Sequence, residues 1–305
     1  MDPGFLRLPT EIRLQIYHYL LLPQTPTDLQ PALHKMQHSD RDSFDYVSGR
    51  RFSDRIVAHP DLVNPHLLIR TVKGESYSAR YTGKPGGERH LRTSYDEKDR
   101  FRAKCAMTTY YCLNNDFLLA HVGIMRVNRL VHSEAVGVLY GAYTFDFDVH
   151  VEAMRPFLED LTPLARSCIR SVRFVKRGLA YDKEYDRIEW GNTMRFLTLP
   201  SAGLRIKRLE LGVVAGKPGG ASGTGWDGVL TYSADDFEAL LSGDGMEWLR
   251  DLVELAKTLE ELTVVPVVEH CPPADNSRAM FNFVRFSASV DAGFAEFLQR
   301  RVMGA

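Results

Sequence analysis

The stretch "LRLPTEIRLQIYHYLL", Leu6 to Leu21, predicts a short helix close to the start of the 305-residue chain. Pro9 suits the first turn of a helix, because the N–H that proline lacks would have no partner there. Glu11 follows in the same turn, where the helix dipole favours an acidic side chain. Pro23 cannot continue the helix, so we expect the helix to end near Leu22.

A helical wheel places apolar side chains on two opposite sides of this helix. One side carries Leu8, Ile12, Ile16, Tyr19 and Leu20, and the other carries Leu14, Tyr17 and Leu21. A helix with apolar residues on all sides is expected to be buried on all sides. One side can pack on another helix of the chain, whereas the second needs a cover from elsewhere in the protein or from a partner. An uncovered apolar side would be a surface of the kind that marks an interaction site.

The segment from Thr25 to Lys104 is polar and rich in Pro, Gly, His and Arg. Strand-like patterns occur at His66–Val72 and around Ser76–Thr82, and "GKPGGERH", Gly83 to His90, is typical of a loop. A structureless loop of this length is unusual inside a compact domain. We therefore interpret the segment as a partly ordered insertion.

Helical patterns return between residues 103 and 140, where two helices are expected. The second helix carries apolar residues and Glu134 at helical spacing, and Gly141 is expected directly after its end. The following "AYTFDFDV" alternates aromatic and acidic residues. This alternation predicts a half-buried strand with Asp146 and Asp148 on its solvent side.

Single strands alternate with helices in the second half of the chain, which is typical of parallel β–α units. The expected strands are Ile169–Val175, Ile206–Val214, Leu259–Val268 and Ala279–Ser287. A helix in two pieces is expected between residues 233 and 259, broken near Gly243 and Gly245, and a closing helix at Val290–Met303. The pattern predicts an α+β protein whose second half is either an irregular leucine-rich-repeat-like stack or a small α/β sheet.

The composition is that of a globular protein, with 44% hydrophobic and 25% charged residues. The formal net charge of −1 gives the whole molecule no strong attraction to nucleic acid or membranes. The charge is uneven, because Arg41–Lys104 has 14 Lys and Arg against 9 Asp and Glu, whereas Gly225–His270 has 2 against 11. Four widely spaced cysteines fit a reducing compartment. Without a signal-peptide pattern or an apolar stretch of about 18 residues, we expect a cytoplasmic or nuclear protein.

The sequence contains no strong motif for catalysis, cofactor binding or metal binding. The Gly-Lys pair at Gly216 is followed by Pro218, whose missing N–H does not suit a phosphate-binding loop. The cysteines and histidines between residues 105 and 132 lack the short spacings of a zinc site. We therefore predict no catalytic residue, no cofactor and no metal.

Two other kinds of function stay open on the sequence alone. A pocket between the two halves of the chain would make the protein an enzyme or a ligand-binding protein. The residues that could line this pocket are polar or aromatic and lie near expected strand ends. They are Asp146, Asp148, Arg173, Trp190 and Tyr81. The basic stretch Arg41–Lys104, with its interleaved aromatic residues, is compatible with nucleic-acid binding, which is the weaker alternative.

Two blocks of the sequence carry a recognisable pattern. In the opening helix it consists of Leu8, Pro9, Glu11, Ile12, Arg13, Ile16, Tyr17, Leu20 and Leu21. In "IMRVNRLVHSEAVGVLYGAYTFDF", Ile124 to Phe147, it consists of Arg126, Arg129, Ser133, Glu134, Ala135, Leu139, Tyr140, Thr144 and Phe145. Together the blocks resemble the F-box-like domains of a large fungal protein family. The resemblance implies an F-box-like helical region over residues 1–150, with the insertion at about 25–104, and an α/β or repeat-like region over 151–305.

An F-box helix docks on a Skp-type adaptor, which links it to a cullin ubiquitin ligase, and the remainder of the chain selects the substrate. The resemblance therefore implies a non-enzymatic protein-recognition module that serves as substrate receptor of such a ligase. The partner-binding residues that it implies are Leu8, Pro9, Ile12, Leu14, Ile16, Tyr17, Leu20 and Leu21. Because the segment from Leu22 to Gly123 separates the two blocks, the alternative is that the opening helix packs wholly inside the protein.

Overall fold

The structure is a computed structural model of the chain. It describes residues 4–24, 44–45, 50–51, 64–71, 97–98, 107–108, 110–112, 116–148, 150–176, 184–218, 225–243, 246–271 and 277–303. The expected strand around Ser76–Thr82, the loop at Gly83–His90 and the candidate residue Tyr81 lie outside the described residues. Most of the basic stretch Arg41–Lys104 also lies outside them.

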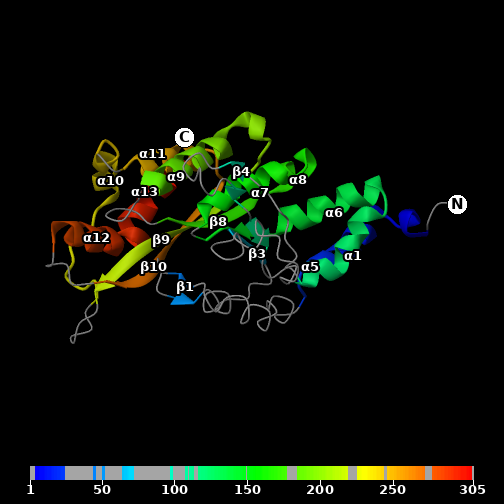
Figure 1. Ribbon diagram of the computed structural model, residues 1–305, viewed down its shortest axis with the longest axis horizontal. Coiled ribbons are helices and arrows are strands. Elements are labelled where there is room, and N and C mark those ends of the chain that lie inside the picture. The colour runs from blue at the N-terminus through cyan, green and yellow to red at the C-terminus, as the bar shows by residue number, and fades with distance from the viewer. Residues whose placement is uncertain are drawn as a thin grey trace.

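Six strands of the described residues form one sheet in the order β10-β9-β8-β7-β3-β6 (Figure 1). They are β3 His66–Thr71, β6 Tyr110–Cys112, β7 Thr144–Asp146, β8 Ser171–Lys176, β9 Arg208–Pro218 and β10 Glu261–Cys271. Neighbours from β3 to β10 pair in parallel, and β6 pairs with β3 in antiparallel fashion. From β3 to β10 the order across the sheet follows the order along the chain, as expected when right-handed connections stay on one face.

Helices connect these strands and close both ends of the chain. The first half contains η1 Gly4–Arg7, α1 Thr10–Leu21, α5 Asp116–His121, η3 Val122–Arg126 and α6 Arg129–Ala142. The second half contains η4 Val151–Ala153, α7 Met154–Asp160, α8 Pro163–Cys168, α9 Glu184–Thr198, η5 Pro200–Ala202, α10 Ala234–Leu240, α11 Glu247–Ala256, α12 Arg278–Ala288, η7 Val290–Phe294 and α13 Ala295–Met303. No helix of the described residues is long and apolar enough to span a membrane. Helices together with a largely parallel sheet confirm the α+β class.

Two further two-stranded sheets lie in the described ranges of the first half. They are β1 Phe44–Asp45 with β2 Arg50–Arg51, and β4 Glu97–Lys98 with β5 Met107–Thr108. Both are antiparallel pairs. Neither is part of the main sheet, which is the element that organises the core.

The main hydrophobic core lies between one face of the sheet and the helices that cover it. On β9 the alternate residues Leu209, Leu211 and Val213 are buried in this core. Trp190 of α9 and Trp248 of α11 pack edge to face there, with ring centroids 6.2 Å apart. Core residues come from both halves of the chain, and β7 pairs with β8. The boundary predicted at residue 150 therefore falls within a continuous sheet, and the two regions share one core.

Most predicted elements of the second half are confirmed. The segments Ile169–Val175, Ile206–Val214 and Leu259–Val268 correspond to β8, β9 and β10, although β9 and β10 extend further along the chain. The expected two-piece helix is present as α10 and α11. Parallel strands in chain order occur both in a repeat-like stack and in a singly wound α/β sheet. The observed strand order is therefore compatible with both of the predicted alternatives.

Two local predictions are wrong. The helix expected to end before Gly141 includes that residue. The segment Ala279–Ser287, expected as a strand, forms α12, in which Ser277 accepts a hydrogen bond from the Met280 N–H as N-cap. Four of the buried residues of α12, Met280, Phe283, Val284 and Ser287, follow the helical period, and Phe286 is buried beside them. Aromatic and β-branched residues indicated a strand, and packing against the sheet decided for a helix.

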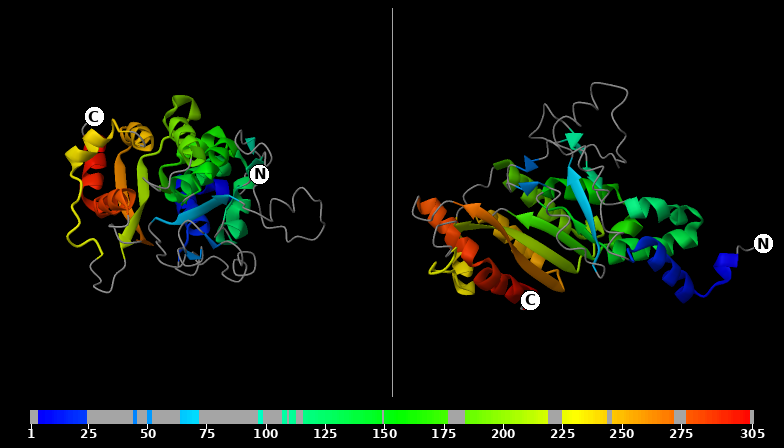
Figure 2. Two further views of the ribbon diagram at one scale, coloured as in Figure 1. Left: turned by 60° about the vertical axis from the view of Figure 1, so that its left-hand side comes forward. Right: turned by 90° about the horizontal axis from the view of Figure 1, so that it is seen from below.

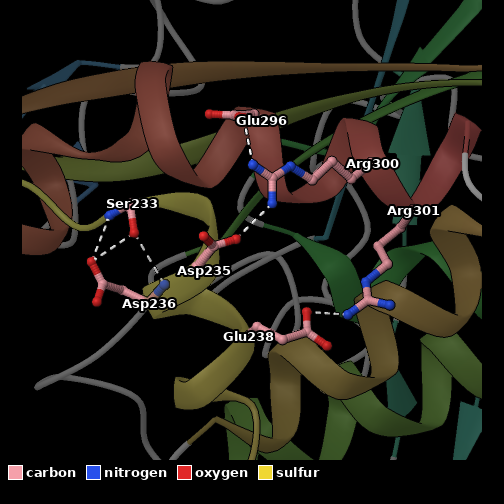
Figure 3. Close-up of polar contacts among 7 residues, drawn as sticks. All are labelled: Ser233, Asp235, Asp236, Glu238, Glu296, Arg300 and Arg301. Atoms are coloured by element: carbon pink, nitrogen blue, oxygen red, sulfur yellow. Dashed lines mark hydrogen bonds and ion pairs between the residues drawn. The ribbon is translucent and has the colours of Figure 1, made fainter.

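The closing helix α13 is attached to α10 by ion pairs at the surface (Figure 3). Arg300 pairs with Asp235 at 2.7 Å, and Arg301 pairs with Glu238. Ser233 caps α10, and its side chain accepts a hydrogen bond from a backbone N–H in the first turn. Both ion pairs join elements more than 60 positions apart in the sequence. They therefore span the contact between the C-terminal helix and α10 at the surface of the protein.

Candidate partner-binding surface

α1 and α6 lie side by side at one end of the molecule, so the two matching blocks of the sequence meet in space (Figure 2). The hydroxyl of Tyr143, directly after α6, donates to the carbonyl of Leu21 at the end of α1 at 2.9 Å. The predicted pairing of the two blocks is thus present, although Leu21 and Tyr143 are 122 positions apart.

A polar network centred on Glu134 joins the two helices. Arg13 donates to both carboxylate oxygens of Glu134, from Nε at 3.0 Å and from Nη2 at 2.6 Å. The hydroxyl of Tyr17 donates to the same carboxylate at 2.9 Å. Arg13 also donates to the Leu8 carbonyl at 2.5 Å and to the Thr10 hydroxyl at 3.0 Å. The charged groups are therefore paired and hydrogen-bonded, which is the form in which charges are tolerated away from water.

The network holds its members in defined protonation states. Hydrogen bonding from Arg13 lowers the pKa of Glu134, so the carboxylate is charged at neutral pH. Burial raises the pKa of Tyr17 to about 12, and its hydrogen bond to Glu134 acts in the same direction. The Tyr17 hydroxyl therefore keeps its proton and remains a donor. With no group that exchanges a proton near neutral pH, this network is suited to holding α1 in place and not to acid–base chemistry.

The side of α1 that carries Leu14, Tyr17 and Leu21 packs against the protein itself. Tyr17 and Leu21 have no exposed surface, and Leu14 is half-buried against the main core. The ring of Phe5 packs on Tyr17 with centroids 6.0 Å apart. Tyr17 and Leu21 therefore cannot contact a partner while α1 stays on α6, although the resemblance places them among the partner-binding residues.

The other side of α1 is partly exposed. Ile12 is 41% exposed and Tyr19 is 69% exposed, with the half-buried Ile16 between them. Leu8 and Leu20 are half-buried, and Pro9 is exposed. We refer to Ile12, Ile16 and Tyr19 as the α1 flank. A large exposed aromatic side chain next to exposed aliphatic ones is a feature of interaction surfaces.

The residues predicted to line a pocket do not converge on one. Asp146, Arg173 and Glu210 occupy opposite positions on β7, β8 and β9 and form a row of charges across the sheet. Arg173 donates to Asp146 at 2.9 Å and to Glu210 at 2.8 Å. Burial alone would lower the pKa of Arg173, but the attraction of the carboxylates outweighs it and raises the pKa. His66 Nδ1 lies 3.7 Å from Asp146.

The prediction that Asp146 and Asp148 lie on the solvent side of their strand is wrong. They are only 4% and 3% exposed. Asp146 is sheltered by its ion pair with Arg173 and accepts a hydrogen bond from the Asp148 N–H at 2.7 Å. Asp148 has a positive φ of 47°, a conformation that Asp tolerates better than most residues. The burial and the contacts of these two carboxylates therefore indicate a structural role.

Trp190 lies on the opposite face of the sheet from this row of charges. Its indole N–H donates to the Trp248 carbonyl at 2.9 Å, and its ring packs on Phe174 with centroids 5.4 Å apart. Two shallow depressions of the described residues are elsewhere: one of about 510 Å³ between α10 and α11, and one of about 160 Å³ after α9. The predicted pocket residues that the structure describes, Asp146, Asp148, Arg173 and Trp190, line neither depression. Among the described strands, the parallel ones from β3 to β10 follow chain order, so no switch point of the kind at which open α/β sheets bind ligands lies between them.

No family model matches the chain, and the searches of curated proteins and of solved structures found no match.

Sequence reasoning missed the part played by Arg13 and Glu134. Both belong to the matching blocks, but the wheel indicated only apolar sides. The signal that could have found them is their pairing: one arginine and one glutamate, each at the centre of its block, with a tyrosine one turn after the arginine. Such a set fits a bidentate pair with a third donor.

Proposed function

We propose that this protein is a non-enzymatic recognition protein that docks on a Skp-type adaptor through the α1 flank and serves as substrate receptor of a cullin ubiquitin ligase. One observation carries the proposal: α1 is anchored on one side by the Glu134 network, while Ile12 and Tyr19 on its other side are exposed. An apolar flank on a fixed helix suits docking better than it suits solvent.

The geometry of the flank supports a protein partner. Tyr19 offers a large aromatic ring with few rotatable bonds, the type of side chain that commonly dominates interface energetics. The anchored inner side of α1 means that little backbone ordering accompanies binding, which lowers the entropic cost of association. The resemblance to F-box-like domains, carried by residues such as Pro9, Arg13 and Glu134, supplies the identity of the partner. The sheet and its helices would then select the substrate.

The test replaces the two most exposed residues of the flank. We expect the Ile12→Ser/Tyr19→Ser variant to bind a purified Skp-type adaptor at least about tenfold more weakly than the wild-type chain in isothermal titration calorimetry, because interface anchors carry most of the binding energy. Leu199→Ser/Leu230→Ser is the matched control, since both leucines are exposed, at 51% and 71%, on the second half of the chain. It should bind like the wild type.

Circular dichroism and thermal unfolding of both variants establish that the fold is intact. An absence of any complex between the wild-type chain and the adaptor would reject the ligase role. Equal losses in the flank variant and in the control would reject the α1 flank as the docking surface.

A further inference from the structure

The second matching block contains exposed residues that the contact between α1 and α6 does not use. They lie where η3 meets α6, and they are Arg126, Val127, Arg129 and Leu130. Asn128 in their midst is extended, with φ −163° and ψ 175°, and caps α6 by accepting the Val131 N–H at 2.9 Å. The chain turns a corner at this point. We refer to the four residues as the α6 corner.

All four side chains of the α6 corner are exposed. Val127 is 62% exposed and Leu130 is 48% exposed, whereas Val131, the next residue, is fully buried. In the part of the chain that the structure describes, neither Arg126 nor Arg129 takes part in a side-chain hydrogen bond or ion pair. Two cationic and two apolar side chains are thus presented together to the solvent.

The local electrostatic field at the corner is positive. α6 has 14 residues and no acidic side chain in its first turn, so the positive end of its dipole adds to the two arginines. The first turn of η3 has no acidic residue either. The nearest carboxylate along α6, that of Glu134, is already held by Arg13. A partner that meets this corner is therefore favoured when it carries negative charge.

We propose that the α6 corner receives an acidic, partly apolar region of the adaptor, as a second contact beside the α1 flank. This inference rests on the proposed function for the identity of the partner. Carboxylates would pair with Arg126 and Arg129, and an apolar contact would cover Val127 and Leu130. Arginine among exposed apolar side chains is typical of protein interfaces, whereas nucleic-acid surfaces are met mainly through contacts to phosphate.

Leu130 lies one helical turn before Glu134 on α6, and Leu8 and Thr10 contact Arg13 at the start of α1. The corner thus lies about one helical turn along α6 from the carboxylate that binds Arg13 of α1. A partner seated on α1 is in reach of the corner without a change in the fold.

The experiment titrates the full-length chain with the adaptor at low and at high NaCl. We expect the Arg126→Glu/Arg129→Glu variant to bind about tenfold more weakly at low salt, with a smaller difference at high salt because exposed charges are screened. Val127→Ser/Leu130→Ser should weaken binding with little change in salt dependence. Arg205→Glu/Arg278→Glu, which reverses two exposed charges elsewhere, is the matched control and should bind like the wild type.

The outcomes separate this proposal from the proposed function. If the adaptor binds and the corner variants bind equally well, the corner is rejected while the docking role stands. If the adaptor does not bind at all, a labelled peptide of Glu, Asp and Leu decides: binding that is lost in the Arg126→Glu/Arg129→Glu variant supports the corner, and no binding rejects it. Tighter binding of a single-stranded oligonucleotide than of this peptide, sensitive to the same variant, would also reject it.

Discussion

The first and last helices of the described chain are both tied to the body by arginine–carboxylate pairs, but the surroundings of the pairs differ. Arg13 and Glu134 have side chains only 7% and 13% exposed, and Tyr17 completes their network. At the other end, Arg300 and Asp235 are 53% and 87% exposed (Figure 3). The same chemistry is therefore sheltered in one region and open to water in the other.

Because of this difference in exposure, different kinds of contact hold the two helices. Exposed ion pairs contribute little, because water and salt screen them and because long side chains must be ordered. The C-terminal helix is held instead by a cluster of aromatic rings below the ion pairs, formed by Phe237, Phe286, Phe294, Phe297 and Trp248. At α1 the polar network contributes a larger part of the stabilisation, since only one side of that helix is buried.

The largest expected effect comes from the aromatic cluster. Phe237→Ala should lower the free energy of unfolding by about 3–5 kcal/mol, because Phe237 has no exposed surface and its removal leaves a cavity among the rings of Phe286, Phe294 and Phe297. Urea unfolding followed by circular dichroism measures this loss. Phe237→Leu is the matched control and should lose clearly less. A loss below about 1 kcal/mol for the alanine variant would contradict the comparison.

The next effect comes from the network at α1. Glu134→Ala should lower the free energy of unfolding by about 1–3 kcal/mol, because it leaves the Tyr17 hydroxyl and the Arg13 guanidinium without their shared acceptor. In the Glu134→Ala variant, amide hydrogen exchange should become faster than in the wild type, and this increase should be larger in α1 than in α11. Unchanged protection of α1 in this variant would mean that the apolar side alone holds the helix.

The pH dependence of Glu134→Gln isolates the charge of the network. The pKa of Glu134 is lowered in the folded chain, so its contribution to stability is present above its unfolded pKa of about 4.3 and is lost as pH falls through the lowered folded value. The wild-type chain should therefore lose more stability than Glu134→Gln across this acidic window. Parallel stability profiles for the two proteins would show that the charge contributes nothing.

Local patterns predicted much of the fold but not which side of α1 is buried. Both sides carry several apolar residues, so the wheel could not choose between them. The choice depends on Arg13, whose charge favours solvent by any local criterion. Its partner Glu134 is 121 positions away, and no pattern within α1 can reveal it.

Asp146 of β7 illustrates the same limit. The alternation around Asp146 correctly predicted a strand, yet the acidic side of the strand is buried. Arg173 and His66, on the neighbouring strands, shelter Asp146 there. The order of strands in the sheet brings these residues together, and that order is a property of the whole chain. Sequence patterns therefore predicted elements well and their polar partners poorly.

The smallest expected effect comes from the exposed pair between Arg301 and Glu238. Glu238→Gln should change the free energy of unfolding by less than about 1 kcal/mol, because Glu238 is 57% exposed and its pair with Arg301 is screened by water. The difference should vanish in high salt, whereas the loss in Glu134→Ala should persist in part, since its groups are sheltered from ions. The two substitutions affect separate contacts, one at α1 and one at α13, so their effects should add in the double variant. An effect of Glu238→Gln as large as that of Glu134→Ala would show that exposure does not govern the strength of these ties, and the distinction between the two ends would fail.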